Sequence, residues 1–151
     1  MFSFGSFFVF YYFLAMASAT ATSQPPDCTT KAIPYVCSPT IRNLTFQAIS
    51  AKIKGAVYDC DLEKAAFVKS LYGDSQLYKE FPKDLYRTAI IFKRREYSTN
   101  FEAGFVKEAL DVYSEKLATI ENPRKFGCNF YPEGGDDNNK GRKFVLVCLI
   151  K

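Results

Sequence analysis

Two stretches of the chain carry apolar residues at helical spacing. The clearest runs from about residue 101 to residue 120, where apolar positions are separated by four, three, four and three residues. Those positions are Val106, Leu110, Tyr113, Leu117 and Ile120. Because this spacing places them on one side of a helix, we expect the stripe to lie in the core and Asn122-Pro123 to end the helix.

Two shorter helices are predicted nearer the N-terminus. Thr40 is a candidate N-cap for the first, whose apolar positions are Ile41, Leu44, Ala48 and Ile49. The second is predicted from about residue 60 to residue 71, because acidic residues at its start favour a helix N-terminus and good helix formers follow. We expect this helix to end near Gly73-Asp74.

The C-terminal part of the chain has the pattern of a β-hairpin. Strands are predicted at Lys125 to Tyr131 and Arg142 to Ile150, on either side of a polar loop rich in Gly, Asp and Asn. If Cys128 lies opposite Cys148, the same register pairs apolar residues: Phe126 with Ile150 and Phe130 with Leu146. Opposed Cα atoms lie about 4.5–5.5 Å apart, within the roughly 4.4–6.8 Å range of a disulfide. The register that permits a cross-strand disulfide therefore also creates one apolar face.

Two segments are less regular. Residues 22–40 contain four prolines and no periodicity, which favours an extended N-terminal arm held by Cys28 and Cys37. Thr88 to Phe92 form a short apolar run that could be a strand or a buried helical turn. We expect one domain, over residues 41–151, to follow the arm.

The N-terminus has the pattern of a secretory signal peptide. No charged side chain occurs between Met1 and Pro26, and residues 7–16 form an apolar run. This run is too short to span a bilayer, which takes about 20 apolar residues. Ala19 and Ala21 complete sites for cleavage. We therefore predict a signal peptide at residues 1–21 and a soluble, secreted mature protein.

All five cysteines follow the predicted signal peptide: Cys28, Cys37, Cys60, Cys128 and Cys148. An oxidising secretory route favours disulfides over metal binding for such cysteines. Because five is an odd number, one thiol stays free or pairs with another chain. The first three allow three pairings with one cysteine left over, and we favour Cys37 with Cys60.

The absence of histidine excludes several kinds of catalytic and metal-binding site. It excludes Ser-His-Asp and Cys-His nucleophilic sites, His-based zinc sites and a His general base. A formal net charge of +4 and a pI near 8.7 fall short of the strongly basic character of nucleic-acid-binding domains. We expect no metal and no cofactor.

Three weak site candidates remain. The basic cluster Lys93, Arg94 and Arg95 is a candidate binding patch, although such short clusters are common on solvated faces. The loop tip from Gly134 to Asn138 is another, and its acids lack the ligand spacing of a calcium loop. Asn43 begins an N-glycosylation sequon.

Residues 49–66, ISAKIKGAVYDCDLEKAA, and two short segments, FGC at 126–128 and FVLVC at 144–148, carry a family resemblance. The first is similar to the entry to the second helix in nematode activation-associated secreted proteins of the CAP superfamily. The other two resemble the closing strands of that family, in which the two cysteines are bridged. The resemblance implies an α/β fold, a small three-layer α-β-α sandwich with a C-terminal antiparallel hairpin, and a Cys128–Cys148 disulfide.

The sequence lacks the residues that could give members of this family a metal site. The tetrad of two His and two Glu that can hold a metal cannot form without histidine. The G-H-x-x-Q element is missing, because residues 118–125 run directly into Phe126. Glu108 and Glu115 lie in the region of the family's helical Glu, but with Tyr113 they do not reproduce its W-x-x-E spacing. We therefore expect a divergent relative that has kept the fold and lost the cavity chemistry.

The resemblance implies a secreted, non-enzymatic excretory-secretory protein that binds host proteins or a small lipid, with a role in immune modulation. Secreted ribonuclease-like effectors of fungi are an alternative that would bind RNA or a host protein. They share an early Tyr-x-Cys, here Tyr35-Val36-Cys37, and an aromatic-Pro-Lys segment, here Phe81-Pro82-Lys83. However, they are mostly β with a single helix. A carboxylate-pair glycosidase is a third class, but no pair of acids is singled out, so no catalytic residue is named.

Overall fold

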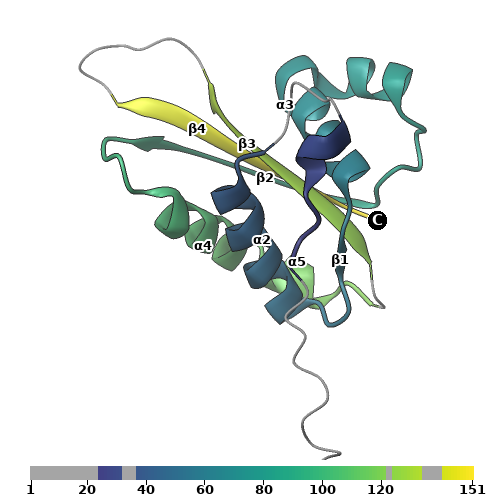
Figure 1. The fold of residues 1–151 in the computed structure, drawn as a ribbon, viewed down its shortest axis with the longest axis horizontal. Helices are drawn as coiled ribbons and strands as arrows, with labels where there is room; N and C mark the ends of the chain where they lie inside the picture. Colours follow the sequence, from purple (N-terminus) through teal and green to yellow (C-terminus); the bar gives the residue numbers. More distant parts are fainter. Residues whose placement is uncertain (1–23, 32–36, 122–123, 134–140) are drawn as a thin grey trace, which may run out of the picture.

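The computed structural model describes residues 24–31, 37–121, 124–133 and 141–151. Within them, four strands form one mixed sheet in the order β1-β3-β4-β2 (Figure 1). β1 (Val57–Tyr58) runs parallel to β3 (Lys125–Glu133). β4 (Arg142–Ile150) lies between β3 and β2 (Thr88–Glu96) and is antiparallel to both.

Helices cover both faces of this sheet. α2 (Pro39–Lys52), α4 (Glu102–Val112) and α5 (Ser114–Ala118) lie on one face (Figure 1). α3 (Cys60–Glu80) packs on β3 and β4 from the other face, and a short 3-10 helix, η1 (Cys28–Lys31), precedes α2. The fold is thus the predicted small three-layer α-β-α sandwich with a C-terminal antiparallel hairpin.

β4 contributes to two cores because its side chains alternate between the two faces of the sheet. From residue 145 to residue 150 every side chain is buried. The even-numbered residues belong to the core beneath α2 and α4, and the odd-numbered residues belong to the core beneath α3. A continuous apolar run is what a strand covered on both faces requires.

The hairpin has the predicted register. Cys128 lies opposite Cys148, and the flanking pairs are Phe126 with Ile150 and Phe130 with Leu146. The two cysteines are bonded in the structure, with Cα atoms 4.0 Å apart. The ambiguous run at residues 88–92 is a strand, because β2 pairs residue for residue with β4.

Helix ends differ from the predictions in three places. Ser38, not Thr40, caps α2, and its hydroxyl accepts a hydrogen bond from the Ile41 N–H at 3.3 Å. α3 continues past residue 71 to Glu80, with a break at Gly73 (φ 75°), because the buried Leu77 anchors the second part. The predicted helix at 101–120 is divided into α4 and α5 at Tyr113, although its whole apolar stripe packs in the core as predicted.

The disulfide partner of Cys60 also differs from the prediction. The structure bonds Cys60 to Cys28, with Cα atoms 5.5 Å apart, and leaves Cys37 as a buried free thiol. Cys37 directly precedes the N-cap of α2, and its backbone N–H donates to Glu63 at 2.8 Å. η1 instead brings Cys28 to the first residue of α3. The expected Cys37–Cys60 bridge is therefore wrong.

Some predictions lie outside the described residues: the signal peptide at 1–21, part of the arm at 32–36 and the loop tip from Gly134 to Asn138. Among the helices of the described ranges, none has the length and apolar character needed to cross a membrane.

Candidate functional site

A buried ion pair joins α2 to α3. Arg42 Nε donates to Glu63 Oε2 at 2.8 Å, and Arg42 Nη2 donates to Glu63 Oε1 at 2.9 Å, so the guanidinium and the carboxylate meet at two points. The two residues are only 3% and 2% exposed. Because an unpaired charge at this depth is strongly unfavourable, each group depends on the other.

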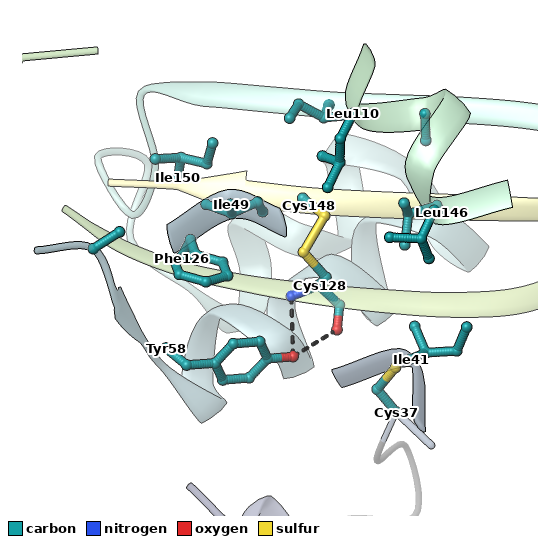
Figure 2. Close-up of a cluster of buried hydrophobic side chains, with 14 of the residues drawn as sticks. Cys37, Ile41, Ile49, Tyr58, Leu110, Phe126, Cys128, Leu146, Cys148 and Ile150 are labelled. Atoms are coloured by element: carbon teal, nitrogen blue, oxygen red, sulfur yellow. Dashed lines mark hydrogen bonds between the residues drawn. A yellow bond between two sulfur atoms is a disulfide. The ribbon is translucent and has the colours of Figure 1, made fainter. Parts of the chain in front are cut away.

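Cys37 and Tyr58 complete the surroundings of Glu63. The Cys37 N–H donates to Oε1 at 2.8 Å, and the Tyr58 hydroxyl donates to Oε2 at 2.7 Å. The same hydroxyl accepts from the Cys128 N–H at 3.3 Å and lies 3.1 Å from the Cys128 carbonyl oxygen (Figure 2). The Tyr58 side chain thus extends the pairing of the two-residue strand β1 along β3. We call Cys37, Arg42, Tyr58 and Glu63 the buried polar cluster.

The buried polar cluster offers no reactive group at neutral pH. Burial, together with the neighbouring Glu63 carboxylate, raises the pKa of the Cys37 thiol to about 12. The same two causes raise the pKa of the Tyr58 hydroxyl well above its ordinary value. Hydrogen bonding to Glu63 raises the pKa of the Arg42 guanidinium, which therefore stays charged. The cluster holds α2, α3, β1 and β3 together and supplies neither an acid nor a nucleophile to a substrate.

The protein should lose stability as the pH rises above about 9. The unfolded chain releases the Cys37 proton near the ordinary pKa of 9.0, whereas the folded chain retains it until about 12. Above pH 9 the folded state binds more protons, so the free energy of unfolding falls by up to about 1.4 kcal/mol per pH unit for this group. Tyr58 adds to the decline above its ordinary pKa of 10.0. Urea unfolding midpoints measured from neutral to strongly alkaline pH would test this.

A Cys37→Ala variant is the control for this pH dependence. Without the thiol, the midpoint should stay level until the ordinary tyrosine pKa of 10.0 and only then decline. Parallel declines of the two proteins between pH 9 and pH 10 would contradict the role of Cys37.

An open groove of about 460 Å³ lies between α2 and α4. Residues at positions i, i+3, i+4, i+7 and i+8 of each helix line it: Leu44, Gln47, Ala48, Ala51 and Lys52 from α2, and Ala103, Val106, Lys107, Leu110 and Asp111 from α4. This spacing corresponds to one face of each helix. Alanines at three of these positions leave space between the helices. The volume lies within the roughly 300–1,000 Å³ range of small-molecule sites.

The groove is apolar over most of its length and charged at one end. Lys107 Nζ lies 2.7 Å from an Asp111 carboxylate oxygen, and Lys52 Nζ lies 3.8 Å from the other. The hydrogen bond to Asp111 raises the pKa of Lys107. Two ammonium groups therefore share one carboxylate, which leaves this end with a surplus positive charge. The arrangement suits a molecule with an apolar chain and an anionic end.

The predicted basic cluster does not form a single patch. Lys93, Arg94 and Arg95 lie on β2, where successive side chains point to opposite faces. Lys93 pairs with Glu133 at 2.8 Å, and Arg94 pairs with Glu96 and Glu108. Arg95 Nη1 donates to the Gly141 carbonyl at 3.4 Å. The alternation therefore places Arg94 on the face opposite Lys93 and Arg95, and each of the three cations has a partner within the protein.

The structure also places the predicted glycosylation sequon at Asn43. Asn43 is exposed on α2, while the sequon's Thr45 is buried and its hydroxyl donates to the Ile41 carbonyl at 2.8 Å. Across the described parts of the chain, no group of three or more His, Cys, Asp or Glu is placed to hold a metal ion.

Sequence reasoning missed both the buried polar cluster and the groove. The signal for the cluster was a charged residue within an apolar stripe: Arg42 shares a helix face with Thr45 and Ile49, and Glu63 follows the buried Leu62. Two opposite charges in this position on neighbouring helices indicate a buried pair. The groove had a weaker signal, the small residues Ala48, Ala51 and Ala103 on the helix faces that meet.

Comparison with known proteins gives one match. The family model described as "Ancylostoma-associated secreted protein related" matches residues 28–150, which include η1 and every helix and strand described above. No curated protein and no solved structure matches the chain.

Proposed function

We propose a binding function for this chain, which belongs to the Ancylostoma-associated secreted protein related family. The family description and two disulfides in the structure support an extracellular location. We infer a secreted, non-enzymatic protein that binds a small lipid with an anionic end, such as a fatty acid, in the groove between α2 and α4. In a parasite, such a protein would act in host–parasite interaction.

The observation that carries this proposal is the combination of an apolar groove with a surplus charge at one end. Val106 and Leu110 form a buried apolar floor, and Leu44 and Ala48 are half-buried beside it. An acyl chain lying along them would remove apolar surface from water, at about 25 cal/mol per Å². Its carboxylate would meet Lys52 and Lys107, whose two charges are balanced by Asp111 alone at this end.

The residues that line the groove also support the proposal of a non-enzymatic role. The chain has no histidine, and the groove is lined by alanines, aliphatic side chains, one amide and three charged groups. The buried polar cluster is enclosed in the protein interior. The ribonuclease-like alternative fits less well, since α2 to α5 cover both faces of the sheet instead of one helix accompanying a mostly β fold.

Fluorescence titration with cis-parinaric acid would test the proposal. The purified protein should bind the acid, and Ala51→Phe should weaken binding about tenfold or more, because the ring fills the groove. Lys107→Glu should weaken binding of the acid more than binding of the corresponding alcohol, because it reverses the charge beside the carboxylate.

Ala118→Phe is the matched control, since Ala118 is also an exposed helical alanine but does not line the groove. It should bind the acid as the natural protein does. The proposal fails if the natural protein does not bind the acid, or if Ala51→Phe and Ala118→Phe bind it equally well.

A further inference from the structure

A second surface gathers cations from three strands at one end of the sheet. β2 and β3 begin at this end and β4 reaches it, because both neighbours are antiparallel to β4. The Arg87 N–H donates to the Ile150 carbonyl at 2.9 Å, and the Lys151 N–H donates to the Lys125 carbonyl at 2.8 Å. These bonds continue the sheet by one row, so Arg87, Lys151 and Lys125 are cross-strand neighbours. The chain terminus in Figure 1 marks this end.

These residues line two pockets that share three lining residues; we treat the pockets as two lobes and call them together the sheet-end groove. The first lobe, of about 360 Å³, is lined by Asp84, Tyr86 and four cations: Arg87, Arg124, Lys125 and Lys151. The second lobe, of about 280 Å³, shares Arg87, Arg124 and Lys151 with the first. It adds Thr88, Thr119, Glu121 and two isoleucine side chains. Only Arg124 and Lys125 are adjacent in the sequence, and Arg87 and Lys151 come from distant segments, so no basic run predicted this site.

The sheet-end groove carries an excess of positive charge. Lys125 Nζ lies 3.3 Å from an Asp59 carboxylate oxygen, while Arg124 Nε donates to the backbone carbonyl of Glu121 at 3.0 Å. In the part of the chain that the structure describes, the side chains of Arg87 and Lys151 have no ion-pair partner. Asp84 and Glu121 are the side-chain carboxylates of the lining, so with Asp59 counted the four cations exceed the side-chain carboxylates by one.

Like charges on neighbouring strands repel one another, so an anion between them would be favourable. Arginine presents a planar fork and lysine a compact ammonium, which together suit the oxygens of a tetrahedral sulfate or phosphate group. Beside this basic lobe, the second lobe offers two hydroxyls, a carboxylate and aliphatic surface. Hydroxyls and carboxylates form hydrogen bonds with a hydroxylated ring, and aliphatic side chains cover its apolar face.

We propose that the sheet-end groove binds a sugar unit that carries a sulfate or phosphate ester. The ester group occupies the first lobe against Arg87, Lys151 and Arg124. The sugar ring occupies the second lobe beside Thr88 and Thr119. The lining of this groove shares no residue with the groove between α2 and α4, so the proposal is independent of lipid binding.

Calorimetric titration of the full protein at physiological salt would test this proposal. The ligands are a sulfated heparin disaccharide, a hexose phosphate and inorganic sulfate. At least one sugar ester should bind about tenfold more tightly than inorganic sulfate, because the second lobe adds contacts. The ester that binds more tightly identifies the source of the anionic group. If neither sugar ester binds more tightly than inorganic sulfate, the proposal is wrong.

Two double variants distinguish binding in the sheet-end groove from nonspecific attraction between the ligand and the positively charged protein. Arg87→Gln with Lys151→Gln removes two exposed cations of the groove and should weaken binding about tenfold or more. Lys54→Gln with Lys79→Gln removes the same charge at exposed positions outside the lining and should leave the affinity within about twofold. Equal losses in the two variants would overturn the proposal.

Thr88→Val should reduce the preference for a sugar ester over inorganic sulfate, which a purely electrostatic surface would not show.

Discussion

Replacing Glu63 with alanine should lower the free energy of unfolding by about 3–5 kcal/mol, because it leaves the buried Arg42 charge without its partner. The Tyr58 hydroxyl and the Cys37 N–H would also lose their acceptor. Unpaired buried polar groups cost about 1–3 kcal/mol each, although such losses are not additive. Urea unfolding at neutral pH, followed by circular dichroism, measures the change.

The double variant Arg42→Met with Glu63→Met is the matched control. It removes both charges and keeps apolar volume, so it should lose less stability than Glu63→Ala, which removes only one charge. Glu63→Gln provides an intermediate case if the alanine variant does not fold. A loss below about 1 kcal/mol for Glu63→Ala would contradict the interpretation of the cluster as an obligate buried pair.

Replacing Gly127 with alanine should destabilise the protein by about 3 kcal/mol or more, because a methyl group has no room there. A Cβ atom at this position would lie 2.2 Å from the Glu63 backbone nitrogen and 2.6 Å from the Asp59 backbone oxygen. Both atoms belong to the start of α3, which cannot move away without disturbing the Glu63 hydrogen bonds. Thermal and urea unfolding of the variant would measure the effect.

Gly104→Ala is the control for this prediction. Gly104 is exposed near the start of α4, and no atom lies within 4 Å of the position that its Cβ would occupy. Alanine favours a helix over glycine, so this variant should be more stable by about 0.5–1 kcal/mol. If both alanine variants had similar stability, close contact between β3 and α3 would not be the cause.

The parts of the fold that sequence reasoning predicted depend on repeated local patterns. The stripe from Val106 to Ile120 specified a buried helix face, and two cysteines with alternating apolar neighbours specified the register of the hairpin. β4 supplied a strong signal because strands covered on both faces read as continuous apolar runs. These signals lie within a few residues of one another, so they can be recognised in one sequence.

The features that were missed depend on tertiary contacts. β1 has only two residues, too few to show a period, and it is held by the Tyr58 side chain against β3. The choice of Cys28 over Cys37 as the partner of Cys60 is set by how η1 and α2 pack. The sheet-end groove combines residues from 84 to 151. By contrast, the alternation of β2 places Arg94 on the face opposite Lys93 and Arg95.

The central position of β4 has a consequence for biosynthesis. A ribosome delivers the chain from its N-terminus, yet β2 pairs only with β4 in the sheet, so β2 has no neighbour until residues 142–150 have been made. The Cys28–Cys60 bond can form while the rest of the chain is still being synthesised, but the Cys128–Cys148 bond must wait for the final strand. The two disulfides therefore mark an early and a late stage of maturation, separated by the synthesis of β2, β3 and β4.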